Sequence, residues 1–396
     1  MRNRIFSYLL ILFLLAGIGI FVLPQREVSA MEKRPLAHNA DITMETVRDG
    51  SLSVTLENIL KDQFYARDTL TSLYYRIKTL LNKPFASAGV DTEGLQDVEF
   101  TFLSDNVIEI NDGYLINNIL LYDDQKAYLA TSRGYNVNEA ATAYPDIRTY
   151  VYFPTRLEEI LDVGNNLNYG LNYRNSYLHQ LSDAIRTDRL KIETVSDYQT
   201  YFQKSDFHWN ARGAYQGYCD IINMISRDFD LDPVRPVKEE ISYPYEFHGN
   251  ISSQVGQLGE TDHITDLLLE GIGDYDYTVN GQPVDLNAVK EDYAAHGNTT
   301  QYSDFDYYFG DNAFERIFDF HQEDKPNILI FADSFTNVTQ EWIASHFNKT
   351  VIIDLRAKDE SFSLQRYVED YDIDIFLVTM YYQNLYFNGN MYIPIN

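Results

Sequence analysis

The sequence contains a single cysteine, Cys219, among its 396 residues. An intrachain disulfide is therefore excluded, even in a compartment that would allow one. Cys219 falls within a segment that we expect to be helical, on or near its apolar side, and nothing around it suggests a lowered pKa. We interpret it as a buried, unreactive thiol rather than a nucleophile.

Positive charge is scarce as well. The chain has 31 Lys and Arg against 59 Asp and Glu, which gives a formal net charge of −28. This excess of acid repels nucleic acids and anionic lipid surfaces at long range, so we expect no nucleic-acid partner. The acidity indicates instead a protein that must stay soluble outside the cytoplasm.

A long apolar run occurs at the N-terminus, where Ile5 to Leu23 carries no charge. This length is just enough to cross a bilayer, and Arg2 and Arg4 in front of it should remain cytoplasmic. We therefore expect residues 1–30 to be a signal anchor, a single transmembrane helix that keeps the rest of the chain on the outer side of the cell membrane. Since Val28-Ser29-Ala30 is a sequence that a signal peptidase accepts, the alternative is a signal peptide cleaved after Ala30, which would give a secreted protein.

Residues 31–100 are expected to form a polar connector followed by an amphipathic helix. Apolar residues at helical spacing extend from Ser51 to Leu81, in a helix that could break near Asp68, and Pro84 ends the pattern. Residues 101–396 are then expected to form the main domain. This domain would contain a loop-rich insertion at about 230–325, where Gly, Asp and Tyr are dense and apolar runs are short.

Local patterns predict several elements in the main domain. Asn111-Asp112-Gly113 between two apolar runs predicts a hairpin, and Asn280-Gly281 predicts a second turn inside the insertion. Tyr150 to Phe153 is expected to be the first core strand, and Tyr177 to Ile185 a helix. The segment after Asn210 is predicted to be a helix that Asn210 caps.

The pattern becomes regular from Asn327 onward, where short apolar strands alternate with helices. The strands are expected at Ile328 to Phe331, Val351 to Ile353 and Ile373 to Val378, and the helices at about Thr339 to Phe347 and at Leu364 to Tyr371. This alternation indicates an α/β fold, with a parallel sheet that is covered by helices on both faces.

Ser334 lies where such a fold binds ligands. In an open parallel sheet ligands bind beyond the carboxyl ends of the strands, and Ala332-Asp333-Ser334 follows directly after the strand at 328–331. The next helix offers unpaired backbone N–H groups and the positive end of its dipole, which stabilise an anion. An acyl-transfer nucleophile benefits from that position.

A serine hydroxyl needs a general base that is itself oriented by a carboxylate. His208 and Asp206 could supply both, because residues two apart in an extended segment project to the same side. Each piece alone is weak, since Asp-x-His is common by chance and a serine after a strand is more often a helix cap. Without Ser334, Asp206 and His208 would be interpreted as an exposed pair that caps the following helix. Trp209 is either an anchor at the edge of the core or a residue that packs behind the histidine.

Several motifs together carry a family resemblance. They are KSDFHWN (Lys204 to Asn210) followed by Gly213-Ala214, ADSF (Ala332 to Phe335), EKRPL (Glu32 to Leu36), DQFYAR (Asp62 to Arg67) and DGYL (Asp112 to Leu115). With these motifs the sequence resembles the SGNH-hydrolase-like proteins of the alginate O-acetyltransferase type and the related DHHW family. In that subgroup the Asp-x-His-Trp block precedes the serine, as it does here, whereas ordinary SGNH hydrolases have the serine first.

The resemblance implies a flavodoxin-like, SGNH-type α/β fold outside the cytoplasm, and transfer or removal of acyl groups on cell-envelope or exopolysaccharide hydroxyls. It carries the nucleophile onto Ser334, the base onto His208 and the orienting carboxylate onto Asp206. A transferase would also need a membrane-bound partner that hands the acyl group across, because acyl-CoA is absent outside the cell. The sequence departs from the family at Ala332, where a glycine is frequent, and at Phe207, where the DHHW name has a second histidine.

Oxyanion donors are less well defined by the sequence. The Ser334 backbone N–H is a natural member of an oxyanion hole. Gln383 and Asn384 follow the last strand and Asn250 lies in a polar loop, so these three side chains are candidates for a second donor. Trp209 is a further candidate for contact with the substrate.

A metal site was considered in the insertion, where acidic and histidine side chains gather. Glu260, Asp262 and His263 lie close together, with His248 and His321 elsewhere in the same segment. No regular ligand spacing appears among them. We therefore interpret them as surface residues and expect neither a metal nor another cofactor.

Two functional hypotheses follow. The first is a membrane-tethered serine O-acyltransferase or acylesterase whose substrate is a polysaccharide or a cell-wall glycan. The second is a noncatalytic glycan-binding or envelope-assembly protein that has kept the fold. A lipid substrate is disfavoured, because the sequence has no large apolar lid segment outside the N-terminal run.

Overall fold

The structure is a computed structural model that describes residues 8, 24–29, 31–32, 34–64, 67–82, 100–117, 120–161, 169–300, 302–310, 313–357, 362–386 and 391–395. Of the predicted signal anchor at residues 1–30, the structure describes only Tyr8 and residues 24–29; the rest of the apolar run from Ile5 to Leu23, and Ala30 at the predicted cleavage site, lie outside the described residues. Among the helices that are described, none is both long enough and apolar enough to cross a membrane.

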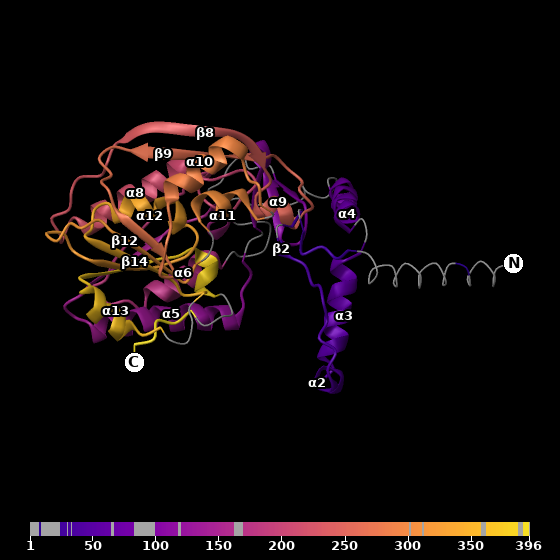
Figure 1. Ribbon diagram of the computed structural model, residues 1–396, viewed down its shortest axis with the longest axis horizontal. Coiled ribbons are helices and arrows are strands. Elements are labelled where there is room, and N and C mark those ends of the chain that lie inside the picture. Colours follow the sequence, from indigo (N-terminus) through magenta and orange to yellow (C-terminus); the bar gives the residue numbers. More distant parts are fainter. Residues whose placement is uncertain are drawn as a thin grey trace.

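A large, mostly parallel sheet forms the centre of the molecule (Figure 1). In the described part of the chain its strands are, in spatial order, β11 (Gln282–Pro283), β10 (Asp276–Val279), β12 (Glu315–Asp319), β14 (Lys349–Asp354), β13 (Ile328–Ala332), β15 (Ile375–Thr379), β6 (Arg148–Phe153) and β7 (Arg186–Arg189). The run from β14 to β7 is parallel, as the sequence predicts, and every residue of β13 and β15 is buried. Burial on both faces explains why these strands are continuously apolar instead of alternating.

Helices cover both faces of this sheet, as expected. In Figure 1, α8 and α12 lie above the sheet, and α5, α6 and α13 lie below it. The bounds of the described helices are α2 (Met44–Arg48), α3 (Ser51–Asp62), α4 (Arg67–Asn82), α5 (Asp124–Ala143), α6 (Gly170–Leu178), α7 (Val195–Tyr201), α8 (Ala211–Ile225), α9 (Asn250–Gln254), α10 (Leu286–His296), α11 (Asp304–Phe309), α12 (Thr336–Ala344) and α13 (Leu364–Tyr371), with short 3₁₀ turns η2 (Asn111–Gly113), η3 (Leu157–Glu159) and η4 (Tyr382–Leu385).

Several predicted elements differ in extent from those observed. The helix expected at Tyr177 to Ile185 is wrong, because α6 ends at Leu178 and the chain then turns into β7. The helix expected from about Thr339 begins at Thr336, two residues after Ser334. The cap of α8 is confirmed, since Asn210 Oδ1 accepts hydrogen bonds from the first-turn N–H groups of Arg212 and Gly213, both at 3.0 Å.

The segment at about 230–325 contains more regular structure than its texture indicates. β8 (Val237–Phe247) and β9 (Asp262–Leu269) form an antiparallel ribbon that lies across the top of the molecule in Figure 1. β10, β11 and β12 extend the central sheet in antiparallel fashion beyond β14, and the predicted Asn280-Gly281 turn joins β10 to β11 with positive φ at both residues. The central sheet is therefore mixed at this edge.

The predicted hairpin at Asn111-Asp112-Gly113 is confirmed. It joins β4 (Val107–Ile110) to β5 (Tyr114–Asn117), and β3 (Phe100–Phe102) completes a small antiparallel sheet. Asp112 and Gly113 have φ of 59° and 78°, the left-handed conformation that Asp and Gly tolerate in tight turns.

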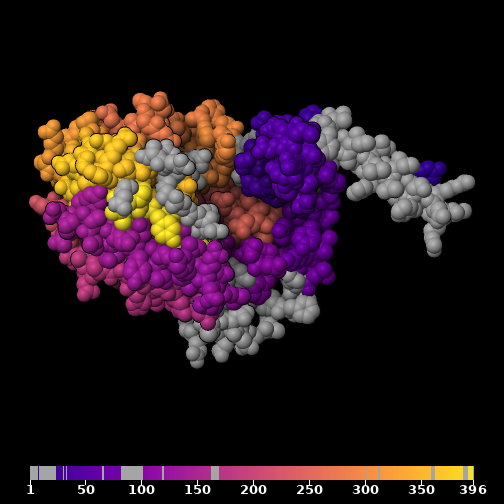
Figure 2. Space-filling view, turned by 90° about the horizontal axis from the view of Figure 1, so that it is seen from below, coloured from indigo at the N-terminus to yellow at the C-terminus, as the bar shows by residue number. Residues whose placement is uncertain are grey.

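The N-terminal elements form a lobe at one end of the molecule, shown in indigo in Figure 2. The helix expected from Ser51 to Leu81 is two helices, α3 and α4, and the break falls just before Asp68. Tyr75 of α4 packs against a small apolar cluster that includes Leu115 of β5 and Ile251 of α9. The N-terminal lobe therefore contacts the main domain next to α9.

Candidate functional site

Ser334 stands at the junction between the buried strand β13 and helix α12. Its neighbour Asp333 fixes this junction, because one carboxylate oxygen accepts a hydrogen bond from the Phe335 N–H at 3.0 Å. The other oxygen accepts from the Tyr381 N–H at 2.6 Å and from the Asn384 side-chain amide at 2.7 Å, both beyond the end of β15. The turn that carries Ser334 is therefore tied to the neighbouring strand, and 5% of the serine surface is exposed.

The structure brings Ser334, His208 and Asp206 together. His208 Nε2 lies 2.8 Å from Ser334 Oγ, and His208 Nδ1 lies 2.6 Å from Asp206 Oδ1. The backbone N–H of His208 also donates to Asp206 Oδ1, at 2.9 Å, which holds the two residues on one side of the loop. This is the order of contacts that a serine nucleophile, its base and an orienting carboxylate require.

Asp206 is fully buried yet well supplied with donors. Its second oxygen accepts the backbone N–H of Asn250, the first residue of α9, at 2.7 Å. Burial on its own raises the pKa of Asp206, but the His208 ring and the N–H groups of Asn250 and His208 outweigh burial and hold the pKa below its usual value. The carboxylate is therefore ionised at neutral pH, as its role beside an imidazole demands.

A second layer of contacts holds the loop in front of Asp206. Ser205 Oγ donates to Asp262 at 2.6 Å and accepts the Gly249 N–H at 2.8 Å. The N–H groups of Ile251 and Ser252 donate to the Ser205 carbonyl at 3.1 and 3.0 Å. The start of α9 and the start of β9 thus clasp the loop from one side.

Arg156 supports the same loop from the side of the sheet. Its side chain is completely buried after the end of β6, where Nε donates to Glu158 at 2.6 Å and Nη2 donates to the Tyr198 hydroxyl at 2.7 Å. The remaining nitrogen, Nη1, donates to the carbonyl of Phe207, which lies between Asp206 and His208 in the sequence. Arg156 is therefore a positioning residue for the histidine loop.

Aromatic rings enclose the imidazole. The ring of Phe305 in α11 stacks on His208 with centroids 3.7 Å apart and an angle of 6° between the planes. Phe207 and Phe335 approach the same ring, with centroid distances of 4.1 and 5.1 Å. The relay is therefore shielded from water, which strengthens its hydrogen bonds.

The predicted oxyanion candidates have different fates. The Asn384 amide is committed to Asp333, and the Gln383 amide donates to the Tyr382 hydroxyl at 3.3 Å, so neither side chain is held ready for a substrate. Asn250 reaches the site through its backbone N–H, which binds Asp206. No hydrogen bond within the described part of the chain uses the Ser334 N–H, which leaves that donor as the remaining candidate.

Trp209 packs behind the histidine instead of facing Ser334. Its side chain is 1% exposed and meets Phe335 edge-on, with centroids 5.5 Å apart. A Cβ at Gly217 would come within 2.5 Å of the indole, which shows how closely α8 approaches it. The packing alternative is therefore the one that the structure supports.

The interpretation of Asp262 as a surface residue is wrong. Both of its carboxylate oxygens accept hydrogen bonds from the Lys204–Ser205 segment, including the backbone N–H groups at 2.8 and 2.7 Å. Glu260 and His263 are exposed, His248 hydrogen-bonds Ser252, and the residues that the structure describes hold no cluster suited to a metal ion. Asp262 was missed because its partners lie in a segment far away in the sequence.

Three residues near the site were assigned no role from the sequence: Arg156, Phe305 and Asp333. Asp333 had a signal, its position directly before the serine. Arg156 and Phe305 had none, because a buried arginine and a ring stacked on an imidazole depend on contacts made between distant segments.

Solved structures with a similar fold are known, although no protein-family model and no curated protein sequence matches this chain. PatB1 of Bacillus cereus, solved with a sulfonyl adduct, has a TM-score of 0.60 at 18% identity, over 74% of this chain and 99% of that one. A DHHW family protein from Eubacterium siraeum gives 0.56 at 15% identity, over 76% and 99%.

The O-acetyltransferase domain of Pseudomonas putida AlgJ is more distant, with a TM-score of 0.40 at 12% identity over 72% of this chain and 93% of that one, too low to indicate a shared fold by itself. The predicted α/β class is confirmed, with a sheet that is mostly but not wholly parallel, and this chain has the fold of PatB1 and of the DHHW family protein.

Proposed function

We propose that this protein is a serine O-acyltransferase or acylesterase in which Ser334 is the nucleophile, His208 the general base and Asp206 the carboxylate that orients the base. The observation that carries the proposal is the continuous chain of hydrogen bonds, 2.6 Å from Asp206 to His208 and 2.8 Å from His208 to Ser334. In the first step His208 Nε2 takes the hydroxyl proton while Ser334 Oγ attacks the acyl carbonyl, and the imidazolium that forms is stabilised by Asp206.

The oxyanion that develops on the carbonyl needs hydrogen-bond donors. The Ser334 N–H lies at the start of α12, where the helix dipole also favours negative charge. His208 then returns its proton to the leaving group, and the acyl group stays on Ser334. A sugar hydroxyl or water then attacks the acyl carbonyl while His208 takes its proton, and that proton passes to Ser334 Oγ as the bond between the acyl group and the serine breaks. Attack by the sugar completes a transfer, and attack by water completes a hydrolysis.

The substrate class follows from the resemblance in the motifs. We propose acyl groups on cell-envelope or exopolysaccharide hydroxyls, with the chain anchored in the membrane through residues 1–30 and facing away from the cytoplasm. A membrane-bound partner would deliver the acyl group, since the outside of the cell has no acyl-CoA. The net charge of −28 suits an exported protein with an uncharged substrate better than one that binds polyanions.

The proposal is tested with the full-length protein in detergent, incubated with p-nitrophenyl acetate with and without oligosaccharide acceptors. Acetate and acetylated sugar are both measured, so that hydrolysis and transfer are separated. Because PatB1 has been solved with a sulfonyl adduct, a sulfonyl fluoride is the matching covalent probe. Ser334→Ala should lower ester turnover by at least about a thousandfold and abolish the labelling seen by mass spectrometry.

A noncatalytic glycan-binding or envelope-assembly protein remains the second candidate. The observation that favours it is the burial of the reacting groups, with Ser334 5% exposed and His208 lying beneath Phe305. In that case the wild-type protein neither turns over the ester nor reacts with the sulfonyl fluoride, and Ser334→Ala changes nothing.

A further inference from the structure

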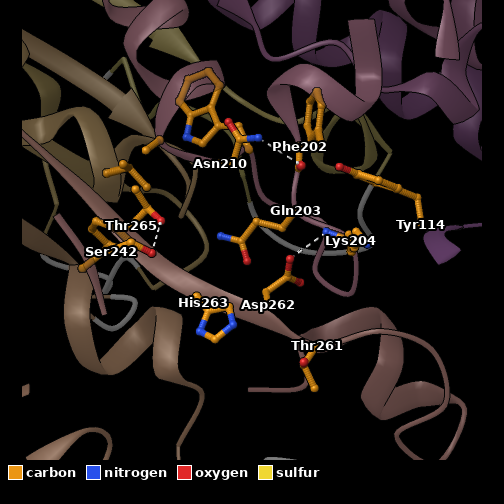
Figure 3. Close-up of a pocket in the computed structure, with 14 residues that line it drawn as sticks. Tyr114, Phe202, Gln203, Lys204, Asn210, Ser242, Thr261, Asp262, His263 and Thr265 are labelled. Carbon is orange, nitrogen blue, oxygen red and sulfur yellow. Dashed lines mark hydrogen bonds between the residues drawn. The ribbon is translucent and has the colours of Figure 1, made fainter. Parts of the chain in front are cut away.

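A pocket of ≈ 300 Å³ lies beside the loop that carries His208 (Figure 3). Residues 202–204 and 209–211 form one side of it, and β8 and β9 form the other through Ser242, Asp262, His263 and Thr265. Its volume is far larger than the roughly 15 Å³ that a single buried water needs. The pocket therefore has room for a ligand, and all the residues that line it are described.

Most polar side chains around the pocket already have partners. Asn210 accepts two N–H groups at the start of α8, Asp262 accepts two backbone N–H groups at 2.7 and 2.8 Å, and the Tyr114 hydroxyl donates to a carbonyl at 3.0 Å. Among the buried polar atoms, two do not: Trp209 Nε1 and Gln203 Oε1 have no hydrogen-bond partner in the described part of the chain. Their residues are 1% and 8% exposed, so bulk water does not supply one freely.

These two groups are held in fixed positions relative to each other. Phe202 and Trp209 form an antiparallel bridge, and the Gln203 N–H donates to the His208 carbonyl at 3.3 Å. Figure 3 shows the Gln203 side chain extending into the middle of the pocket, above His263 and Asp262. Trp209 and Gln203 thus line the same pocket from neighbouring, hydrogen-bonded backbone, and each has one polar atom without a partner in the described part of the chain.

The walls of the pocket connect it to the proposed catalytic residues. Phe309 lines the pocket from α11, the same helix whose Phe305 stacks on His208, and Val338 lines it from α12, one turn after Ser334. Trp209 follows His208 directly and packs against Phe335. A ligand in the pocket would therefore be held next to the loop that carries the base.

We infer that this pocket binds a saccharide and that Trp209 Nε1 and Gln203 recognise one of its hydroxyl groups, an inference that rests on the proposed function. A hydroxyl both accepts and donates, so it matches an indole N–H and an amide oxygen together. The carboxylate that lines the pocket has its oxygens occupied by N–H groups, and the Lys204 ammonium lies over the Tyr114 ring at 5.7 Å from its centre, so an uncharged ligand fits best. Aromatic and aliphatic walls suit the flat faces of a sugar ring.

The chain has only two tryptophans, which makes the pocket directly observable. In the double variant Ser334→Ala, Trp342→Phe, Trp209 is the sole tryptophan and no acyl chemistry interferes. Titration of the full-length variant with chitotetraose and with cellotetraose should give a saturable change in its fluorescence. Permethylated cellotetraose, which cannot donate a hydrogen bond, should give none.

Substitutions then identify the contact. Gln203→Met keeps the length of the side chain but removes its amide, and it should weaken binding about tenfold, which corresponds to about 1.4 kcal/mol. Thr265→Val is the matched control, because it removes from the same wall a hydroxyl that is already hydrogen-bonded to Ser242 at 3.3 Å. Calorimetric titration of Ser334→Ala with both tryptophans present replaces the fluorescence if Trp342→Phe does not fold.

The outcomes separate this inference from the proposed function. No saturable signal with either sugar, an equal signal with the permethylated sugar, or unchanged binding in Gln203→Met overturns the saccharide pocket. If the wild-type protein shows neither ester turnover nor sulfonyl labelling, the catalytic proposal is overturned. The binding result is then judged separately.

Discussion

At the scale of single residues, Asp206 depends on how closely another segment approaches it. A Cβ at Gly249 would lie 2.4 Å from the Asp206 Cβ and 2.7 Å from its Cα, distances that real side chains do not reach. Glycine is thus needed for space at this position and not for an unusual φ, which is −75°. The close approach lets the next residue, Asn250, deliver its N–H to the Asp206 carboxylate.

Gly249→Ala should therefore displace the Asp206 loop and lower kcat for an acetyl ester by about a hundredfold or more, because small misplacements of catalytic groups have that effect. The melting temperature should fall as well. Gly273→Ala is the control, since a Cβ there meets nothing within 4 Å. Wild-type kcat in the Gly249 variant would contradict the account of how Asp206 is held.

The sequence indicated the three residues of the proposed triad but not the contacts that hold them. Asp206, His208 and Ser334 were recognised because their side chains have a chemistry that needs partners, and because their local contexts indicated a loop and a strand end. Asn384 was misjudged because an amide after a strand can face the substrate or bind a neighbour, and here it binds Asp333. The choice between these depends on coordinates that residue type and spacing do not encode.

At the scale of elements, the break between α3 and α4 has a specific cause. Asp62, the last residue of α3, accepts hydrogen bonds from Nη2 and Nη1 of Arg34 at 2.7 and 3.0 Å. It also accepts one from the Ala37 N–H at 2.9 Å. Gln63 hydrogen-bonds the backbone of Arg26 and of Ala37, which flank the short paired strands β1 (Val28–Ser29) and β2 (Arg34–Pro35). The EKRPL and DQFYAR motifs are separate in the sequence, and the contacts between them hold the N-terminal lobe together.

This contact predicts a pH dependence. The hydrogen bonds from Arg34 hold the pKa of Asp62 below 3.8, despite partial burial. A carboxyl whose pKa is lowered in the folded state contributes stability above its unfolded pKa and loses it as the pH falls through the folded pKa. Hydrogen exchange of residues 34–40, corrected for intrinsic rates, should therefore be slow at neutral pH and accelerate below about pH 4.

Asp62→Asn should exchange rapidly in this segment already at neutral pH. Glu57→Gln serves as the control, because it removes an exposed ion pair with Lys61 on the same helix. Equal protection in Asp62→Asn and wild type at neutral pH would show that the contact does not hold the lobe.

The elements that sequence analysis missed share a physical reason. Helix α5 was not predicted although it has 20 residues, because its buried face includes Arg133 and Asn136. Their side chains bind the C-terminal segment, for example Asn136 to the backbone of Ile393 at 2.7 and 2.9 Å. Similarly β12 becomes recognisable as a strand only once β10 and β14 are present to pair with it. Strands β13 and β15 of the parallel core carried their own signal, because they are continuously apolar.

At the scale of the whole molecule, one buried histidine should dominate part of the acid response. His346 is fully buried, and its Nε2 lies 2.7 Å from the Tyr218 hydroxyl, which itself accepts the Arg235 N–H at 2.9 Å. Burial, assisted by the nearby charge of Arg235, lowers the pKa of His346 from 6.5 to about 4. The ring is therefore neutral in the folded protein and takes up a proton more readily when unfolded.

The free energy of unfolding should consequently fall as the pH drops from 6.5 towards 4, by about 3 kcal/mol from this residue. The stabilising contribution is complete above 6.5 and is lost through that interval. Denaturant unfolding at a series of pH values, compared between wild type and His346→Gln, isolates the contribution from that of the carboxyl groups. If the free energy of unfolding depends on pH in the same way in both proteins between pH 4 and 6.5, the proposed contribution of His346 is wrong.

Strand β13, which leads to Ser334, is paired on one side with β14 and on the other with β15, and both come later in the chain. His208 lies 126 residues earlier, so it is synthesised before the strands that position Ser334. A fragment that ends after Ser334 but before β15 keeps every residue of the proposed triad. It lacks the strand that pairs with β13 and so cannot hold the three residues in place. Truncated gene products that retain all the motifs should therefore be inert, and reactivity towards a serine-directed reagent would report that the last strand has docked.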